Sequence, residues 1–280
     1  MKIAISGATG FIGRALVDYF INSGWEIVTL SRIDLEYSSD YELKNKINGC
    51  YAVINLCGAP ISKLWSEKYK YVLRKSRIDT TCRLVSIINR SIIKPSVFIS
   101  TSAIGIYNRN GCHDETSTDY DNTFLSNLCV DWEKEAVKLK KYTRLVIFRL
   151  GIVLDNSGGY LKNVEKASKL GITVNLGNKN KKLCWVSLFD LVKAYNFALF
   201  NEKIKGIVNV CNEQPILQDD LMNLLHKKHH AKLKIRVPDF FIKLFAGDTS
   251  EIFIINQHAA PKILIENGFI FEKHSLNSIF

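Results

Sequence analysis

A glycine-rich segment, Gly7-Ala8-Thr9-Gly10-Phe11-Ile12-Gly13, follows the first apolar run of the chain. That run, Ile3-Ala4-Ile5, is typical of a short buried parallel strand. Beyond the glycines, apolar residues recur three and four positions apart as far as Phe20, which predicts an amphipathic helix. A strand, a glycine turn and a helix form the setting of a dinucleotide site, because glycine lets the backbone approach a pyrophosphate and the helix N-terminus offers free N–H groups. We therefore expect a nucleotide-binding domain at the start of the chain.

Two other interpretations of the glycine segment are weaker. A glycine pattern alone also fits an ordinary turn, but here it lies between a predicted strand and a predicted helix. A phosphate-binding ATPase loop fits poorly, because no Gly-Lys-Ser/Thr follows the glycines.

Length and composition indicate an ordinary globular chain. It has 280 residues, of which 47% are hydrophobic and 23% charged, enough for one large domain or one and a half. No apolar run approaches the roughly 20 residues of a membrane span, and we expect no signal peptide before the first strand. The seven cysteines include no C-x-x-C, which predicts reduced thiols and a cytoplasmic location.

The net charge of +11 is uneven, since residues 141–280 hold 20 basic and 12 acidic side chains. Basic clusters at 179–182 and 227–230 would attract nucleic acid. The whole chain is rich in Lys, Ile and Asn, however, and lacks the interleaved aromatic and basic residues of a nucleic-acid platform. We expect neither a nucleic acid nor a membrane as partner, and leave the oligomeric state open.

The segment after the second predicted strand, Glu26–Leu30, bears on the choice of cofactor. In a dinucleotide fold, the residue that closes this strand meets the adenosine ribose, where Arg suits the 2′-phosphate of NADP and an acidic residue the 2′-hydroxyl of NAD. Ser31-Arg32 stands there, which favours NADP. Asp34, two residues later, keeps NAD as the alternative, and a surface arginine in a loop is the other interpretation of Arg32.

Alternation of strands and helices continues along the chain. We expect the remaining strands at 51–56, 97–102, 144–153 and 207–210, helices at 66–89, 124–139 and 190–199, a loop at 107–122, a looser helical pattern from Gln214, and a final helix that opens at Pro261 and stops at Gly268. This predicts an α/β fold with a Rossmann-like, doubly wound parallel sheet in a domain at 1–155. A smaller, mostly helical region would follow at 156–280, with 185–212 returning to pack on the first domain.

Several blocks sharpen this picture: Val53-Ile54-Asn55-Leu56-Cys57-Gly58-Ala59-Pro60-Ile61, Ser76-Arg77-Ile78-Asp79-Thr80-Thr81, Ser102-Ala103-Ile104-Gly105, Asp131-Trp132-Glu133, Arg149-Leu150-Gly151-Ile152-Val153-Leu154 and Pro261-Lys262-Ile263-Leu264. With the glycine segment, they resemble the atypical short-chain dehydrogenases/reductases of the NAD(P)-binding "epimerase family", whose members carry a small C-terminal domain of unknown function. The resemblance covers essentially the whole chain. It implies an NAD(P)-binding fold, and leaves activity as open as it is for the family.

The glycine segment and the resemblance together give the expected cofactor-binding residues, with no metal site. They are Gly7, Thr9, Gly10, Phe11, Ile12, Gly13, Ser31, Arg32, Leu56, Cys57, Gly58, Arg77, Thr101, Cys129, Gly151 and Val153.

The usual catalytic groups of the superfamily are missing. Ordinary members use a Ser, a Tyr-x-x-x-Lys pair and often an Asn, with Tyr as acid/base and Lys lowering its pKa. Counted back from Glu133, the Tyr and Lys positions fall on Leu125 and Cys129, and the Asn position on Arg77. Only Ser102 remains. The replacements at Cys129 and Arg77 themselves resemble the atypical family.

Three positions depart from the atypical family as well. Ser187 and Phe189 stand where its Trp-x-His-x-Asp-Asp stretch has His and Asp, and Ile106 replaces a Tyr. These departures put any substrate chemistry transferred from the family in doubt.

Two functions of different class follow. The first is an NADP(H)-binding oxidoreductase or epimerase-like enzyme acting on an unknown small molecule. In it Ser102 would polarise a substrate oxygen, Tyr107 would exchange the proton and Arg77 would stabilise an anion. Tyr107 could equally be a packed loop residue, and Cys129 either a ribose contact or core. The second is a non-catalytic NADP(H)-binding regulatory or sensor protein, which the loss of Tyr and Lys favours.

Overall fold

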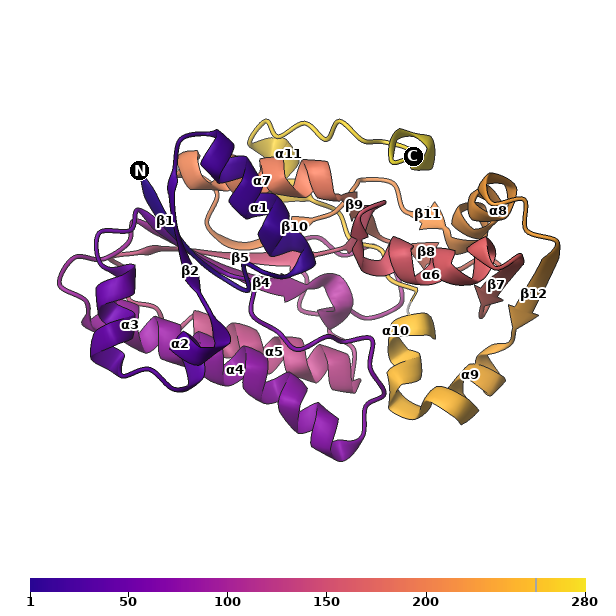
Figure 1. Cartoon of the computed structure of the whole chain (residues 1–280), viewed down its shortest axis with the longest axis horizontal. Coiled ribbons are helices and arrows are strands. Elements are labelled where there is room, and N and C mark those ends of the chain that lie inside the picture. Colours follow the sequence, from indigo (N-terminus) through magenta and orange to yellow (C-terminus); the bar gives the residue numbers. More distant parts are fainter. Residues whose placement is uncertain (255) are drawn as a thin grey trace.

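A parallel sheet of six strands forms the centre of the computed structural model, which describes residues 1–254 and 256–280. Its order is β2 (Glu26–Leu30), β1 (Lys2–Ser6), β3 (Ala52–Asn55), β4 (Val97–Ala103), β5 (Arg144–Leu150) and β10 (Gly206–Val210) (Figure 1). Every neighbouring pair runs parallel. This is the Rossmann-like α/β fold that the sequence predicts.

Helices cover both faces of this sheet (Figure 1). One face packs against α1 (Phe11–Asn22), α7 (Leu188–Phe200) and α11 (Lys262–Glu266). The other packs against α2 (Arg32–Glu36), α3 (Asp40–Ile47) and α4 (Glu67–Arg90), with α5 (Phe124–Ala136) beside α4. Burial of both faces explains why the strands are apolar runs and show no alternation.

The strand order reverses beside β1. The chain crosses from β1 to β2 on one side and then returns to β3 on the other. Open α/β sheets bind ligands at such a switch point, outside the carboxyl ends of the strands. Ser6 and Asn55 end these two strands, and the Ser6 hydroxyl donates to Asn55 Oδ1 at 2.7 Å. The glycine segment and the 56–58 segment follow them directly.

The predicted strand at 144–153 is in fact two strands. The Gly151 amide bonds to Val210, but the Ile152 amide bonds to the Cys184 carbonyl, so the chain leaves the central sheet. It continues as β6 (Ile152–Asp155), which pairs with β9 (Trp185–Ser187). The segment 185–212, expected to return to the first domain, supplies α7 and the edge strand β10.

The C-terminal region contains short strands that the sequence pattern did not indicate. The looser helical pattern from Gln214 is wrong at Leu233–Val237, because this segment is a strand paired with Ile172–Leu176. The remaining elements are α6 (Gly159–Lys169), β7 (Ile172–Leu176), β8 (Lys182–Leu183), β11 (Ile216–Leu217), α8 (Gln218–Lys228), β12 (Leu233–Val237), α9 (Asp239–Ala246), α10 (Glu251–Ile254) and the 3-10 turns η1 (Ile104–Ile106), η2 (Gly247–Ser250) and η3 (Leu276–Ser278). Among the described residues, no helix has the length and apolar character needed to span a membrane.

Candidate functional site: the switch point between β1 and β3

The glycine turn after β1 is held by two close backbone approaches. Gly7 has φ +69°, and a Cβ there would lie 2.9 Å from the Leu56 carbonyl oxygen. At Gly13 a Cβ would lie 2.2 Å from the Gly7 carbonyl oxygen. A side chain at either position would therefore push α1 away from the ends of β1 and β3.

Gly10 differs from these two glycines. A Cβ at Gly10 would have only the Gly7 carbonyl oxygen within 4 Å, at 3.1 Å. Gly10 is the N-cap of α1 and provides no side-chain cap for the first turn of the helix. The N–H groups of that turn, which include those of Phe11 and Ile12, thus have no side-chain cap and are available to an anion.

The Phe11 side chain lies against a second glycine pair. Cβ atoms at Gly158 and Gly159 would fall 2.5 Å and 2.7 Å from atoms of the Phe11 ring. The ring therefore joins the glycine turn to the start of α6.

The structure disfavours the NAD alternative at the end of β2. Asp34 Oδ2 accepts from the amide and hydroxyl of Ser31, each at 2.7 Å, and Oδ1 accepts from Lys46 Nζ at 2.6 Å. Burial works against the charged form of Asp34, but the bonds from Lys46 and Ser31 outweigh it and hold its pKa below its ordinary value. Oδ2 thus caps α2, while Oδ1 is paired with Lys46 of α3.

Arg32 is far more available. Its side chain is 79% exposed, and its Nε donates to Glu36 at 2.8 Å, an i,i+4 pair on the surface. Pairing through Nε leaves the two terminal guanidinium nitrogens to other partners. Those nitrogens supply the fork of donors that a phosphate accepts.

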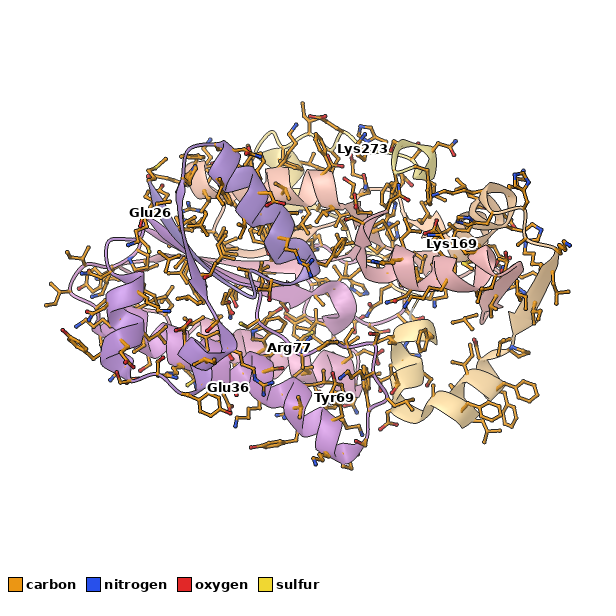
Figure 2. The ribbon with its side chains drawn as sticks, viewed as in Figure 1. Glu26, Glu36, Tyr69, Arg77, Lys169 and Lys273 are labelled. Atoms are coloured by element: carbon orange, nitrogen blue, oxygen red, sulfur yellow. The ribbon has the colours of Figure 1, made fainter. Side chains whose placement is uncertain are left out.

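Arg77 lies beside the segment that follows β3. It donates to the carbonyl oxygens of Ala59 (3.1 Å) and Leu73 (3.3 Å), and its guanidinium lies 5.5 Å from the centre of the Trp132 ring. A Cβ at Gly58 would lie 2.9 Å from Arg77 Cζ. Figure 2 shows Arg77 on α4, directed toward the middle of the molecule. A fixed cation thus stands at the carboxyl end of β3.

The two positions that replace Tyr and Lys are both packed. Leu125 is buried, and a Cβ at Gly105 would meet its Cδ2 at 2.9 Å. Cys129 is buried too, and burial, reinforced by Glu133, raises its pKa to about 12 against the opposing charge of Arg77. It is therefore a neutral thiol at neutral pH and neither exchanges a proton readily nor supplies charge.

Ser102 belongs to a buried ionic cluster. Its hydroxyl donates to Glu133 Oε1 at 2.6 Å, and Arg149 donates to both oxygens of the same carboxylate, at 2.9 Å and 2.7 Å. Burial alone would lower the pKa of Arg149, but Glu133 raises it above its ordinary value. Because its proton is committed to Glu133, Ser102 can accept a hydrogen bond from a substrate but cannot donate one in this arrangement.

Tyr107 lies at the far end of the same cluster. It is fully buried, donates to Asn209 Oδ1 at 2.9 Å, accepts from Arg149 at 2.8 Å, and stacks on His113 with ring centres 5.1 Å apart. Burial raises its pKa to about 12, although Arg149 opposes the shift. This position does not favour the proton-exchanging role predicted for Tyr107 and matches the alternative of a packed residue.

Five further predicted cofactor residues lie in three places. Leu56 and Cys57 follow β3 directly. The Leu56 amide donates to the Ser6 carbonyl oxygen, which places Leu56 beside the glycine turn. Thr101 instead bonds to the Tyr195 hydroxyl at 2.9 Å. Gly151 and Val153 lie where the chain passes from β5 to β6. A Cβ at Gly151 would lie 2.9 Å from the Cys184 carbonyl oxygen, so packing alone accounts for this glycine.

Sequence reasoning assigned no role to Glu133, Arg149 or Asn209, which organise the surroundings of Ser102. One signal was present, an arginine inside an apolar strand, because a buried charge requires a partner. Two of the three departures from the family pattern, Ser187 and Ile106, have plain local roles. Ser187 caps α7 by accepting from the Asp190 amide at 2.9 Å, and Ile106 is buried.

The comparisons with known proteins agree with this arrangement. The model of the NAD dependent epimerase/dehydratase family matches residues 3–211. The chain is 31% identical to the chloroplastic epimerase family protein SDR39U1 homolog of Arabidopsis thaliana, over 97% of this chain and 83% of that protein. It is 29% identical to an epimerase family protein of Staphylococcus haemolyticus, over 100% of this chain and 97% of that one.

Two solved structures have the same fold. The human epimerase family protein SDR39U1 (isoform 2), solved with NADPH, superposes with a TM-score of 0.90 at 23% identity and covers 100% of this chain and 97% of its own. UDP-glucuronic acid 4-epimerase of Bacillus cereus, solved with UDP-glucuronic acid and NAD, gives a TM-score of 0.82 at 17% identity, with 100% and 96% covered.

Proposed function

Because this chain belongs to the NAD-dependent epimerase/dehydratase family, we propose that it binds NADP(H) at the switch point and acts as an oxidoreductase or epimerase-like enzyme on a small molecule. The observation that carries this proposal is the uncapped N-terminus of α1 at Gly10, which opens beside the ends of β1 and β3. The pyrophosphate would lie there, on the amides of the first turn.

The preference for NADP(H) rests on two neighbouring side chains. Arg32 offers free guanidinium nitrogens where the adenosine ribose would lie, whereas the buried Asp34 carboxylate already accepts from Ser31 and Lys46. The human relative was solved with NADPH and the epimerase of B. cereus with NAD, so the fold accepts either cofactor and local residues decide.

The residues near the nicotinamide end would have different catalytic and binding roles from those in ordinary short-chain dehydrogenases/reductases. The cofactor, when bound, supplies hydride chemistry. Arg77, held against Gly58, supplies the positive charge that the replaced lysine would have given, and can hold a ribose oxygen or a substrate anion. Ser102 accepts from a substrate hydroxyl because Glu133 has taken its proton. Tyr107 is held by Arg149 and Asn209, so the proton that accompanies hydride transfer would be exchanged with water.

A non-catalytic NADP(H)-binding sensor is the second candidate. It is favoured by Leu125 and Cys129, which exchange no proton, and by the closed hydrogen bonding of Tyr107. We place either function in the cytoplasm, because all seven cysteines are free.

Mass spectrometry of ligands released from the purified protein tests the proposal. We expect NADP(H), and an enzyme should carry a second small molecule that leaves when the cofactor is oxidised or reduced. NADP(H) alone, with no cofactor turnover against cell extracts, would favour the sensor. A preparation that neither contains nor binds a dinucleotide would contradict both.

A further inference from the structure

The short helix α9 presents an apolar face to solvent at one end of the molecule. Phe240, Phe241, Leu244 and Phe245 are 69%, 48%, 64% and 78% exposed, whereas Ile242 is buried. At 100° per residue the four exposed side chains span about 140° of the helix surface. Together they expose on the order of 500 Å² of apolar surface, as much as the largest patch of a typical monomer.

This end of the molecule is also strongly basic. Residues 227–246, which run from the end of α8 through β12 to α9, hold six basic side chains and one acidic one. Figure 1 shows α8, β12 and α9 together at one end of the long axis. Lys227, Lys232, Lys234 and Lys243 are exposed. Among the ion pairs of the described residues, none involves Lys227, Lys232 or Lys243.

The apolar character extends onto β12. Leu233 and Ile235, on one face of this strand, are 50% and 41% exposed, and Lys234 between them bonds to Asn223 of α8. The lysines thus stand beside the apolar side chains along the whole segment.

We infer that α9 and β12 dock this protein on an anionic lipid surface. Exposed Phe and Leu side chains beside unpaired lysines are typical of a helix that binds at a membrane interface. The apolar face of such a helix enters the headgroup region, and its cations contact acidic lipid headgroups. The expectation of no membrane partner rested on the lack of a spanning segment, and interfacial binding needs none.

A second copy of the chain fits this surface less well. A twofold interface would bring the patch against itself, and would bring the unpaired lysines beside it, Lys232 and Lys243, near their own copies. Like charges opposed across an interface cost several kcal/mol. A nucleic acid would satisfy the lysines, but would leave the phenylalanines in water.

Vesicle co-sedimentation of the full chain tests the inference. The probes are phosphatidylcholine vesicles with and without about one third phosphatidylglycerol. The variant F240S/F245S removes two exposed side chains of α9. The control I92S/I93S makes the same change in the segment after α4, where Ile92 and Ile93 are 90% and 60% exposed. Thermal melts of both variants verify that they remain folded.

We expect wild type and the control to sediment with the anionic vesicles alone, and F240S/F245S to bind at least about 10-fold more weakly. A variant K232Q/K243Q should also bind the anionic vesicles more weakly than wild type does. This difference in affinity should shrink as the salt concentration rises. Absence of binding to anionic vesicles, or equal binding by F240S/F245S and wild type, would overturn the inference. The inference would also be overturned if the wild type formed a dimer and the F240S/F245S variant were a monomer. Binding of the wild type to DNA but not to vesicles would overturn it as well.

Discussion

The hydroxyl of Ser102 donates its proton to Glu133 Oε1 across 2.6 Å, and so the serine that ordinary relatives direct at substrate is turned toward a buried carboxylate. Arg149 holds the same carboxylate through two hydrogen bonds. A structural ion pair therefore fixes the surroundings of Ser102 and leaves its hydroxyl as an acceptor only, so positive charge at the site comes from Arg77.

Removal of the Glu133 charge should destabilise the fold. Glu133→Gln leaves the guanidinium of Arg149, which is fully buried, without its counter-charge. We expect a loss of about 3–5 kcal/mol in the free energy of unfolding, measured by urea denaturation. The control Glu135→Gln, on the same helix, removes a pair with Lys138 that is open to solvent on the lysine side, and should cost about 1 kcal/mol or less. Equal losses for the two variants would show that the cluster is not structural.

Tyr107 should behave as a structural residue. Tyr107→Phe leaves Asn209 Oδ1 without its donor and Arg149 with one acceptor fewer, so it should lower stability by about 1–3 kcal/mol. Cofactor affinity should be unchanged in an NADPH titration. A stable variant whose turnover falls by roughly 10²–10⁴ would instead restore the predicted acid/base role.

Much of the architecture was predictable because burial leaves a strong sequence signal. The glycine turn, β2 at Glu26–Leu30 and the helix now seen at Glu67–Arg90 follow from apolar runs and periodicity. The break at Gly151 was not predictable, because apolar residues continue on both sides while their pairing partner changes from β10 to β9. Strands such as Leu233–Val237 are short and alternate with lysine and arginine, which weakens their pattern.

The candidate site was predictable only in part. Glycines in the sequence indicate a close backbone approach. Which side chains pair with one another, however, depends on the tertiary fold. Nothing local shows that Asp34 is engaged by Lys46, or that Glu133 and Arg149 meet across two elements.

Cofactor preference should depend on Arg32. Arg32→Ala removes the expected fork on the 2′-phosphate and should weaken NADPH binding by about 10- to 150-fold, the equivalent of roughly 1.5–3 kcal/mol. NADH binding should hardly change, because NADH lacks that phosphate. The control Arg90→Ala removes another exposed arginine of a surface ion pair. Equal affinity of the wild type for both cofactors would contradict the preference.

Stability at acid pH should depend on Glu165. Burial opposes its ionisation, but Lys169, His229 and Lys228 hold its pKa at about 2. Because the folded pKa lies below the unfolded one, this stabilisation is complete above about pH 5 and is lost as pH falls toward 2. Glu165→Gln should cost roughly 2–3 kcal/mol at pH 7 and flatten the acid limb of a plot of unfolding free energy against pH. The control Glu67→Gln, at an exposed carboxylate, should show the same fall of unfolding free energy at acid pH as wild type. If the fall in wild type were as small as that in Glu165→Gln, this stabilisation would be excluded.

The most direct measurement is calorimetric titration of NADPH into wild type and Gly10→Val. Gly10 has φ −73° and ψ 175°, which valine adopts, and the Cβ would meet one oxygen at 3.1 Å, so the variant should fold, as circular dichroism would verify. Its side chain would stand where the pyrophosphate must approach the helix N-terminus. We predict micromolar or tighter binding by wild type, on the order of −8 kcal/mol, and none detectable by the folded variant. NADPH binding to folded Gly10→Val with wild-type affinity would contradict the placement of the cofactor at the switch point.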